Sequence, residues 1–215
     1  RAAEESIILR DKEIIDNLRE KSDPDTIPID SMNPKPVEVK VENSLLYVVT
    51  ADPEAEVVEI VLRQKLIWRS PSLAWSNSKP DVDNVSIPLR YLWSPDTAPT
   101  NGVSVQEPLS PEIAVVSADG EITYAPQMRV GIHADLKGLS SSAGVRISFT
   151  LESWTYDNTR FRFASPASSN FDLEEFESKR YKVSDAKVEK RTKWHPSRPS
   201  LHESLEFSFL LKRIE

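Results

Sequence analysis

The organisation of this chain is clearest in the stretch Val145-Arg146-Ile147-Ser148-Phe149-Thr150-Leu151-Glu152-Ser153-Trp154. Apolar side chains stand at the odd positions 147, 149 and 151, and polar or charged side chains stand at the even positions between them. Successive side chains of a strand point to opposite faces, so this alternation predicts a strand with one face in a core. Trp154 has even parity, which places its ring on the polar side of a regular strand. Two interpretations are open: a bulge that returns the ring to the core, or an aromatic wall for a ligand or a partner subunit.

The same period of two recurs along most of the chain. One rail of apolar residues begins at Val37, Val39 and Val41, and we expect Leu45 and Tyr47 to continue it. Further strands are predicted over residues 56–68, 112–117, 121–124, 127–133, 179–190 and 203–212, the last two as a hairpin. Residues 158–175 are interpreted as a long irregular loop.

The N-terminal segment has a different period. Over residues 4–20, isoleucines and a leucine gather on one side and charged residues on the other, which predicts an amphipathic helix. Pro24 and Pro28 prevent the helix from continuing. The sequence therefore predicts an all-β fold, an immunoglobulin-like β-sandwich of about ten strands with an N-terminal α-helix. We expect residues 1–215 to form a single domain, with the sandwich over about 36–213.

Composition excludes several classes of protein. The net charge of −7, with no block of lysine or arginine, argues against a nucleic-acid partner. No apolar run approaches the roughly 20 residues that span a bilayer. The absence of cysteine excludes disulfide frameworks, cysteine zinc sites and thiol catalysis. Sixteen prolines against five glycines indicate ordered turns and edges rather than flexible linkers.

Catalysis and cofactors are not expected. His133, His195 and His202 are the three histidines, and none has the spacing of a metal site. No glycine-rich phosphate loop or nucleophile elbow is present. We therefore predict no enzyme activity, no cofactor and no metal. A titrating His195 or His202 could make ligand binding depend on pH.

Several segments in register resemble the acetylcholine-binding proteins and the extracellular domains of Cys-loop receptors, the pentameric ligand-gated ion channels. The similarity covers essentially the whole chain, although the family cysteines are missing. It rests on Trp93-Ser94-Pro95-Asp96, on the Trp68 and Trp75 pair, on Asp119-Gly120-Glu121, on Ser153-Trp154-Thr155 and on Phe209-Leu210-Leu211-Lys212-Arg213.

The resemblance implies a homopentamer that binds a small molecule at each subunit interface. One subunit would supply the principal face and its neighbour the complementary face. On the principal face, Trp154 matches the central tryptophan, Thr100 replaces a tyrosine, and His202 takes a second tyrosine position. Either Trp194 or His195 takes the remaining position, depending on a one-residue gap. The resemblance implies these residues for the complementary face: Arg63, where a tryptophan is expected, and Thr123, Tyr124 and Ala125.

These departures change the ligand that we expect. In the family, a cationic amine lies against the electron-rich face of the central tryptophan. A guanidinium at Arg63 would repel such a cation, whereas it suits a carboxylate. We therefore expect weak acetylcholine binding and a zwitterionic, anionic or bulky amphipathic ligand. The alternative is that Arg63 pairs with an acidic residue across the interface.

The resemblance leaves two kinds of protein open. A soluble, secreted or extracellular binding protein is favoured by the polar, proline-free stretch 135–144, where receptor subunits carry an aromatic segment that contacts the membrane domain. The alternative is the excised extracellular domain of a channel subunit. Asn84-Val85-Ser86 is a glycosylation triplet, which agrees with an extracellular location but occurs often by chance.

Overall fold

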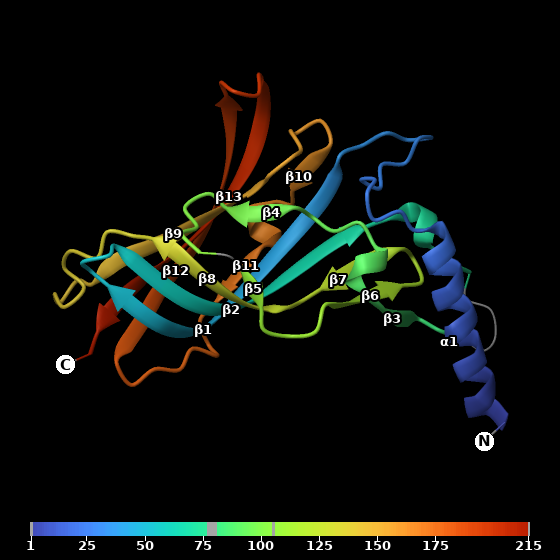
Figure 1. Cartoon of the computed structure of the whole chain (residues 1–215), viewed down its shortest axis with the longest axis horizontal. Helices are drawn as coiled ribbons and strands as arrows, with labels where there is room; N and C mark the ends of the chain where they lie inside the picture. Colours follow the sequence, from blue (N-terminus) through green and yellow to red (C-terminus); the bar gives the residue numbers. More distant parts are fainter. Residues whose placement is uncertain (1, 77–80, 105, 215) are drawn as a thin grey trace.

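The computed structural model describes residues 2–76, 81–104 and 106–214. It contains an N-terminal helix and two β-sheets, so the expected sandwich with a helix is confirmed. The N-terminal helix and the C-terminus lie at opposite ends of the long axis of the molecule (Figure 1). Among the described residues, no helix has the length and apolarity to cross a membrane.

Helix α1 spans Ala2–Lys21, close to the predicted bounds. Ile14 and Leu18 are buried against the end of the sandwich, near strand β3 (Asn84–Pro88) and the short 3₁₀ helix η1 (Pro71–Leu73). Ile15 is partly buried beside them, whereas Ile7, Ile8 and Leu9, on the first turns of the helix, are exposed.

The larger sheet is built on two long strands, β1 (Val37–Asp52) and β2 (Val57–Arg69), which pair antiparallel. The main path runs β10-β1-β2-β7-β6-β3, and three strands pair outside it: β11 on β1, β8 on β2, and β5 on β8. The remaining bounds are β5 (Glu107–Pro108), β6 (Ile113–Ser117), β7 (Glu121–Tyr124), β8 (Gln127–His133), β10 (Phe161–Phe163) and β11 (Asn170–Asp172).

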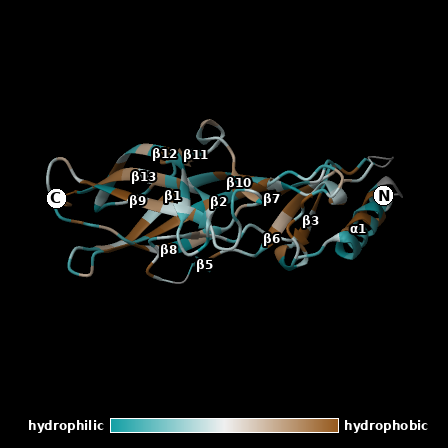
Figure 2. Ribbon diagram, turned by 90° about the horizontal axis from the view of Figure 1, so that it is seen from above, coloured by the Kyte–Doolittle hydropathy of each residue, from teal (hydrophilic) through white to brown (hydrophobic). Residues whose placement is uncertain are grey.

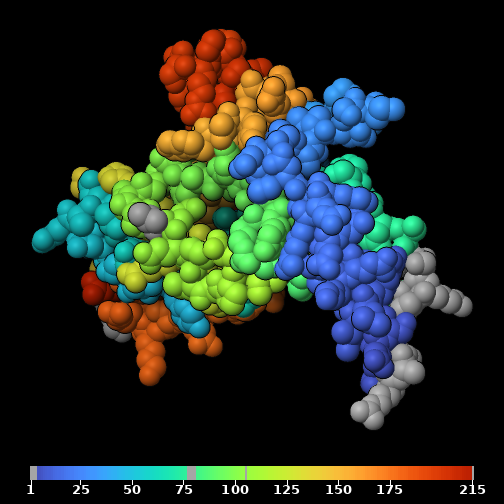
Figure 3. Space-filling model, turned by 45° about the vertical axis from the view of Figure 1, so that its right-hand side comes forward, coloured from blue at the N-terminus to red at the C-terminus, as the bar shows by residue number. Residues whose placement is uncertain are grey.

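The smaller sheet has the order β12-β13-β9-β4. Its strands are β4 (Thr97–Pro99), β9 (Val145–Ser153), β12 (Tyr181–His195) and β13 (Ser200–Arg213). β12 and β13 form the predicted hairpin, with a tip that rises beyond the body of the sandwich (Figures 1 and 3).

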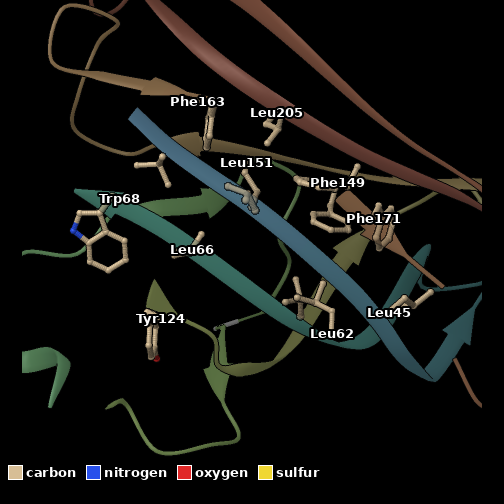
Figure 4. Packing of buried hydrophobic residues seen from close by; sticks show 14 of the residues in the cluster. Leu45, Leu62, Leu66, Trp68, Tyr124, Phe149, Leu151, Phe163, Phe171 and Leu205 are labelled. Atoms are coloured by element: carbon tan, nitrogen blue, oxygen red, sulfur yellow. The ribbon is translucent and has the colours of Figure 1, made fainter. Parts of the chain in front are cut away.

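The core lies between the two sheets. Leu45 and Leu62 enter it from the larger sheet, and Phe149 and Leu205 enter from the smaller one (Figure 4). Apolar residues lie mainly in the strands, and hydrophilic residues are frequent in the connecting loops (Figure 2). The odd rail of β9 is buried as predicted, and the even rail is not.

One residue of the predicted β1 rail lies on the opposite face. Tyr47 is 47% exposed, whereas its neighbours Leu46 and Val48 are buried. The register between β1 and β2 shifts between Leu45 and Tyr47, so two residues of β1 face one residue of β2. An extra residue reverses the faces of everything beyond it. The prediction that Tyr47 continues the inner rail is therefore wrong.

The predicted irregular loop over 158–175 is also corrected. It contains β10, the 3₁₀ helix η3 (Pro166–Ser168) and β11, and both strands pair parallel with β1. Strands of three residues are too short to show a period, so the sequence pattern alone does not reveal them. They close one edge of the larger sheet with the buried rings of Phe161, Phe163 and Phe171.

The loop over 135–144 is held without a disulfide. Leu136 and Leu139 are buried, which anchors the polar loop to the core. Gly144 has φ +70°, and a Cβ there would lie 2.6 Å from the Leu211 carbonyl oxygen, so only glycine fits this close approach.

Candidate functional site

Trp154 is the first residue beyond β9, and its side chain is 70% exposed. The alternation of β9 persists to Ser153, which is buried, so no bulge turns the tryptophan inward. The indole is therefore an exposed aromatic surface at the end of a strand of the smaller sheet. This exposure rules out the interpretation in which a bulge returns the ring to the core, and the aromatic wall for a ligand or a partner subunit stays a prediction.

A turn from another part of the chain fixes the backbone around this ring. The Asp96 carboxylate accepts hydrogen bonds from the Ser153 hydroxyl at 2.6 Å and from the Thr155 backbone N–H at 2.8 Å, and also from the Thr155 hydroxyl. The Trp154 N–H donates to the Asp96 carbonyl at 3.2 Å. Asp96 thus holds the residues on both sides of Trp154, and a charged acceptor makes these bonds strong.

The turn that contains Asp96 is held in place by the packing of Trp93. The ring of Trp93 is buried between Trp68, with centroids 6.3 Å apart, and Tyr156, with centroids 6.1 Å apart. Trp93 therefore joins the core to the loop that carries Trp154. The Trp-x-Pro-Asp motif thus has a structural role: it connects its own turn to the loop that carries Trp154 and to the core.

A cavity of about 310 Å³ lies beside Trp154. β4 contributes Ala98, and the hairpin tip contributes His195, Arg198 and His202. Its complete lining is Ala98, Thr100, Glu152, Ser153, Trp154, His195, Arg198 and His202. Four of the five residues predicted for the principal face thus come together, and the fifth, Trp194, is not among the lining residues.

The two histidines of the cavity have fixed neighbours. Their ring centroids lie 5.9 Å apart. The His202 ring is only 6% exposed and is within 3.0 Å of the Ser200 hydroxyl, and the His195 Nδ1 is 2.8 Å from the Ser197 hydroxyl. Hydrogen bonding from Thr159 lowers the pKa of the nearby Asp157 carboxyl, and Ser200 and the charge of His202 lower it further.

Trp194 lies on the outside of the hairpin. Its side chain is 59% exposed and stands opposite Leu201 in the strand ladder. Of the two alignments left open by the sequence, the geometry favours the one in which His195 takes the first tyrosine position.

The residues predicted for the complementary face lie on a different part of the surface. Arg63 of β2 donates from one nitrogen, Nη1, to both carboxylate oxygens of Glu175, at 2.8 and 3.1 Å. This acidic partner belongs to the same chain, 112 residues away, and not to a neighbouring subunit. Arg63 therefore already has a counter-ion within its own protomer.

The strands beside Arg63 carry the other predicted residues. Thr123 of β7 is paired with Ile67 of β2 and with Val115 of β6, and Ala125 is exposed at the end of β7. Tyr124 is buried in the core, and burial raises the pKa of its phenol. Its side chain is therefore on the inner face, away from Thr123 and Ala125.

A second charged group lies next to Arg63 on the same sheet. Glu42 of β1 binds Lys40 at 2.6 Å and Lys65 at 3.1 Å. The hydrogen bond from Lys40 holds the pKa of the Glu42 carboxyl below its usual value, and Lys65 lowers it further. Two lysines on one carboxylate leave this group with a net positive charge.

Comparison with known proteins decides the family. Residues 11–136, more than half of the chain, match the family described as the neurotransmitter-gated ion-channel ligand binding domain. The chain belongs to this family. It is a family of ligand-binding domains of ion channels, and not a family of enzymes.

Individual relatives agree with this assignment. The chain is 31% identical over 115 residues to neuronal acetylcholine receptor subunit eat-2 of Caenorhabditis briggsae, which covers 53% of this chain and 24% of the relative. Identity to eat-2 of Caenorhabditis elegans is 28%, over 66% of this chain and 31% of the relative. Identity to neuronal acetylcholine receptor subunit alpha-10 of Rattus norvegicus is 25%, over 81% of this chain and 40% of the relative. The chain thus spans less than half the length of these relatives.

The structure adds residues that the sequence did not single out for a site. Asp96 holds the loop that carries Trp154. Glu152 and Arg198 line the cavity, and Val115 lies beside Thr123. Glu152 and Trp154 both have even numbers and therefore point to the same side of β9, and this was the one sequence signal that could have indicated Glu152. Arg198 has no such pattern.

Proposed function

We propose that this chain is a ligand-binding subunit that forms a homopentamer and binds a small molecule at each interface between subunits. The principal face is formed by Trp154, Thr100, His195 and His202. The complementary face of the neighbour is formed by Arg63, Thr123 and Ala125, on the outer side of β2 and β7. Family members are pentameric, which supports the assembly.

The observation that carries this proposal is the exposed ring of Trp154. An exposed indole offers a large apolar surface with one polar N–H, which is why tryptophan is enriched at interfaces. Here it also borders a cavity and has a backbone fixed by Asp96. Such a rigid aromatic wall can bind a flat or apolar group of a ligand with little loss of entropy.

Acetylcholine is a poor fit to this site. Around Trp154 the cavity offers Thr100 and two imidazoles in the tyrosine positions, with the guanidinium of Arg198 beside them, so a cation would be surrounded by few aromatic faces. Because Glu175 offsets the charge of Arg63, repulsion by Arg63 alone is weaker than the sequence suggested. A zwitterionic, anionic or amphipathic ligand suits the combination of Trp154 and positive charge better.

Two kinds of whole protein fit this function. The first is a soluble, secreted binding protein of the acetylcholine-binding-protein type, supported by the polar loop over 135–144. The second is the extracellular part of a channel subunit, which is supported by the similarity to receptor subunits.

Light scattering on the purified chain tests the assembly. We expect a particle of about five times 24.3 kDa.

A thermal-shift screen of small amphipathic ligands, on the wild type and on Trp154→Ala, tests the site. We expect at least one ligand to stabilise the wild type, with the shift lost in the variant. A protomer that stays single at high concentration would sink the proposal.

A further inference from the structure

Arg198 stands at the tip of the hairpin, between β12 and β13, and lines the cavity beside Trp154. Its Nη1 donates a hydrogen bond to the backbone carbonyl of Trp154. The bond spans 44 residues of chain and connects the tip of the hairpin to the end of β9. A guanidinium has five N–H donors, so a single bond to a carbonyl leaves donors that can bind a ligand.

The charge of Arg198 is not offset by the protein. Within residues 2–76, 81–104 and 106–214, no carboxylate lies within ion-pair distance of its guanidinium. The acidic residue of the cavity lining, Glu152, has a cation of its own, Lys193, at 3.7 Å. Within the described residues, Arg198 is thus a cation of the cavity lining without a carboxylate partner, in a chain that is acidic as a whole.

The ion pairs on the predicted complementary face also sum to a positive charge. Arg63 and Glu175 cancel, and Glu42 is shared between Lys40 and Lys65, which leaves one positive charge. The carboxylates named on the two faces, Glu152, Glu175 and Glu42, each already have a cationic partner. An anion would find cations on both.

We propose that Arg198 selects the charge of the ligand: it binds a carboxylate or sulfonate group while the apolar body of the ligand lies on Trp154. This inference rests on the proposed function of the site. A guanidinium presents parallel N–H donors that match the two oxygens of such an anion. A cationic ligand on Trp154 would instead lie close to a like charge, in a partly enclosed space where repulsion is poorly screened.

Two probes of matched size and opposite charge test this assignment. Benzenesulfonate and phenyltrimethylammonium each carry one phenyl ring and one compact charged group. Dissociation constants are measured by ¹⁹F NMR on protein labelled with 5-fluorotryptophan, with the Trp154 signal assigned from Trp154→Phe. We expect the wild type to bind benzenesulfonate at least tenfold more tightly than phenyltrimethylammonium.

Three substitutions separate the role of Arg198 from general charge. Arg198→Gln should weaken benzenesulfonate binding about tenfold and strengthen phenyltrimethylammonium binding severalfold. Arg198→Lys should keep the preference for the anion but reduce it, because the forked geometry is lost. Arg191→Gln is the matched control: Arg191 is on the same hairpin but pairs with Glu189 and Glu206 outside the cavity, so neither constant should change.

The possible failures are distinguishable. If both probes shift the Trp154 signal but Arg198→Gln leaves the ratio of their constants unchanged, the assignment of Arg198 is overturned and the proposed site stands. If neither probe affects the Trp154 signal in any form of a correctly folded pentamer, the proposed site and this inference fall together.

Discussion

The two ends of the β12–β13 hairpin differ in almost every physical property. At its root, Leu205, Phe207, Phe209 and Leu211 point into the core and are fully buried. At its tip, every residue from 191 to 199 is exposed. The root is fixed by packing, and the tip is placed over Trp154 by the hydrogen bond from Arg198 and by one from the Asn158 N–H to the Leu201 carbonyl at 2.9 Å.

This difference separates stability from recognition within one element. Because substitutions at exposed positions change the free energy of unfolding little, the residues of the tip can vary with little effect on the fold. The root cannot vary in the same way, since each buried side chain contacts several others. Under the proposed function, the residues of the tip can therefore change with the ligand while the root keeps the fold.

Phe207→Ala, at the root, tests the difference where we expect the largest effect. The ring is fully buried, lies 5.4 Å from Phe149 in a stacked arrangement and 5.6 Å from Phe171 edge-on. Its removal leaves a cavity that the rigid sheets fill poorly, so we expect a loss of about 3–5 kcal/mol in the free energy of unfolding. Urea denaturation at fixed protein concentration measures it. Phe207→Leu, which keeps most of the volume, should lose clearly less, and equal losses would contradict this account.

Glu203→Gln, just above the root, should have an intermediate effect. The Glu203 carboxylate is nearly buried and accepts from the Lys190 ammonium at 2.9 Å and from the Phe163 N–H at 2.8 Å, which joins the hairpin to β10. The amide can still accept one bond but leaves the ammonium without a counter-ion, so we expect a loss of about 1–3 kcal/mol.

A double-mutant cycle with Lys190→Met isolates that pair. If the carboxylate and the ammonium stabilise each other, the double variant should lose less than the sum of the two single losses. Additive losses would show that the pair contributes nothing and that the root is held by apolar packing alone.

The parts of this structure that the sequence predicted are those with a local repeating pattern. The alternation in β9 predicted the buried rail and placed Trp154 on the polar side of a regular strand, because parity depends only on neighbouring residues. It left open the bulge that would have buried the ring. The same alternation gave the wrong face for Tyr47. The bulge before it depends on how β1 is paired with β2 and cannot be recognised in the pattern of β1 alone.

The charged contacts of the site could not be predicted in this way. Arg63 finds Glu175 across 112 residues, and Arg198 finds the Trp154 carbonyl across 44. Both are contacts of a long side chain with a segment distant in the sequence, which only the folded arrangement brings together. The family resemblance pointed to Arg63 and the hairpin, but it gave no partner for either cation.

Trp194→Ala, at the tip, should have the smallest effect and decides which residue of the tip faces the ligand. Its ring is largely exposed and does not line the cavity, so we expect a change below about 0.5 kcal/mol in the free energy of unfolding. The dissociation constants of benzenesulfonate and phenyltrimethylammonium, measured here by titration calorimetry because Trp154→Ala has no indole signal, should also stay within twofold of the wild type, whereas Trp154→Ala should weaken both. A Trp194→Ala variant that weakens both probes as strongly as Trp154→Ala would bring this second tryptophan into the site, in agreement with the alternative alignment of the tip. The separation of root and tip would survive that result, but the place of His195 on the principal face would pass to Trp194.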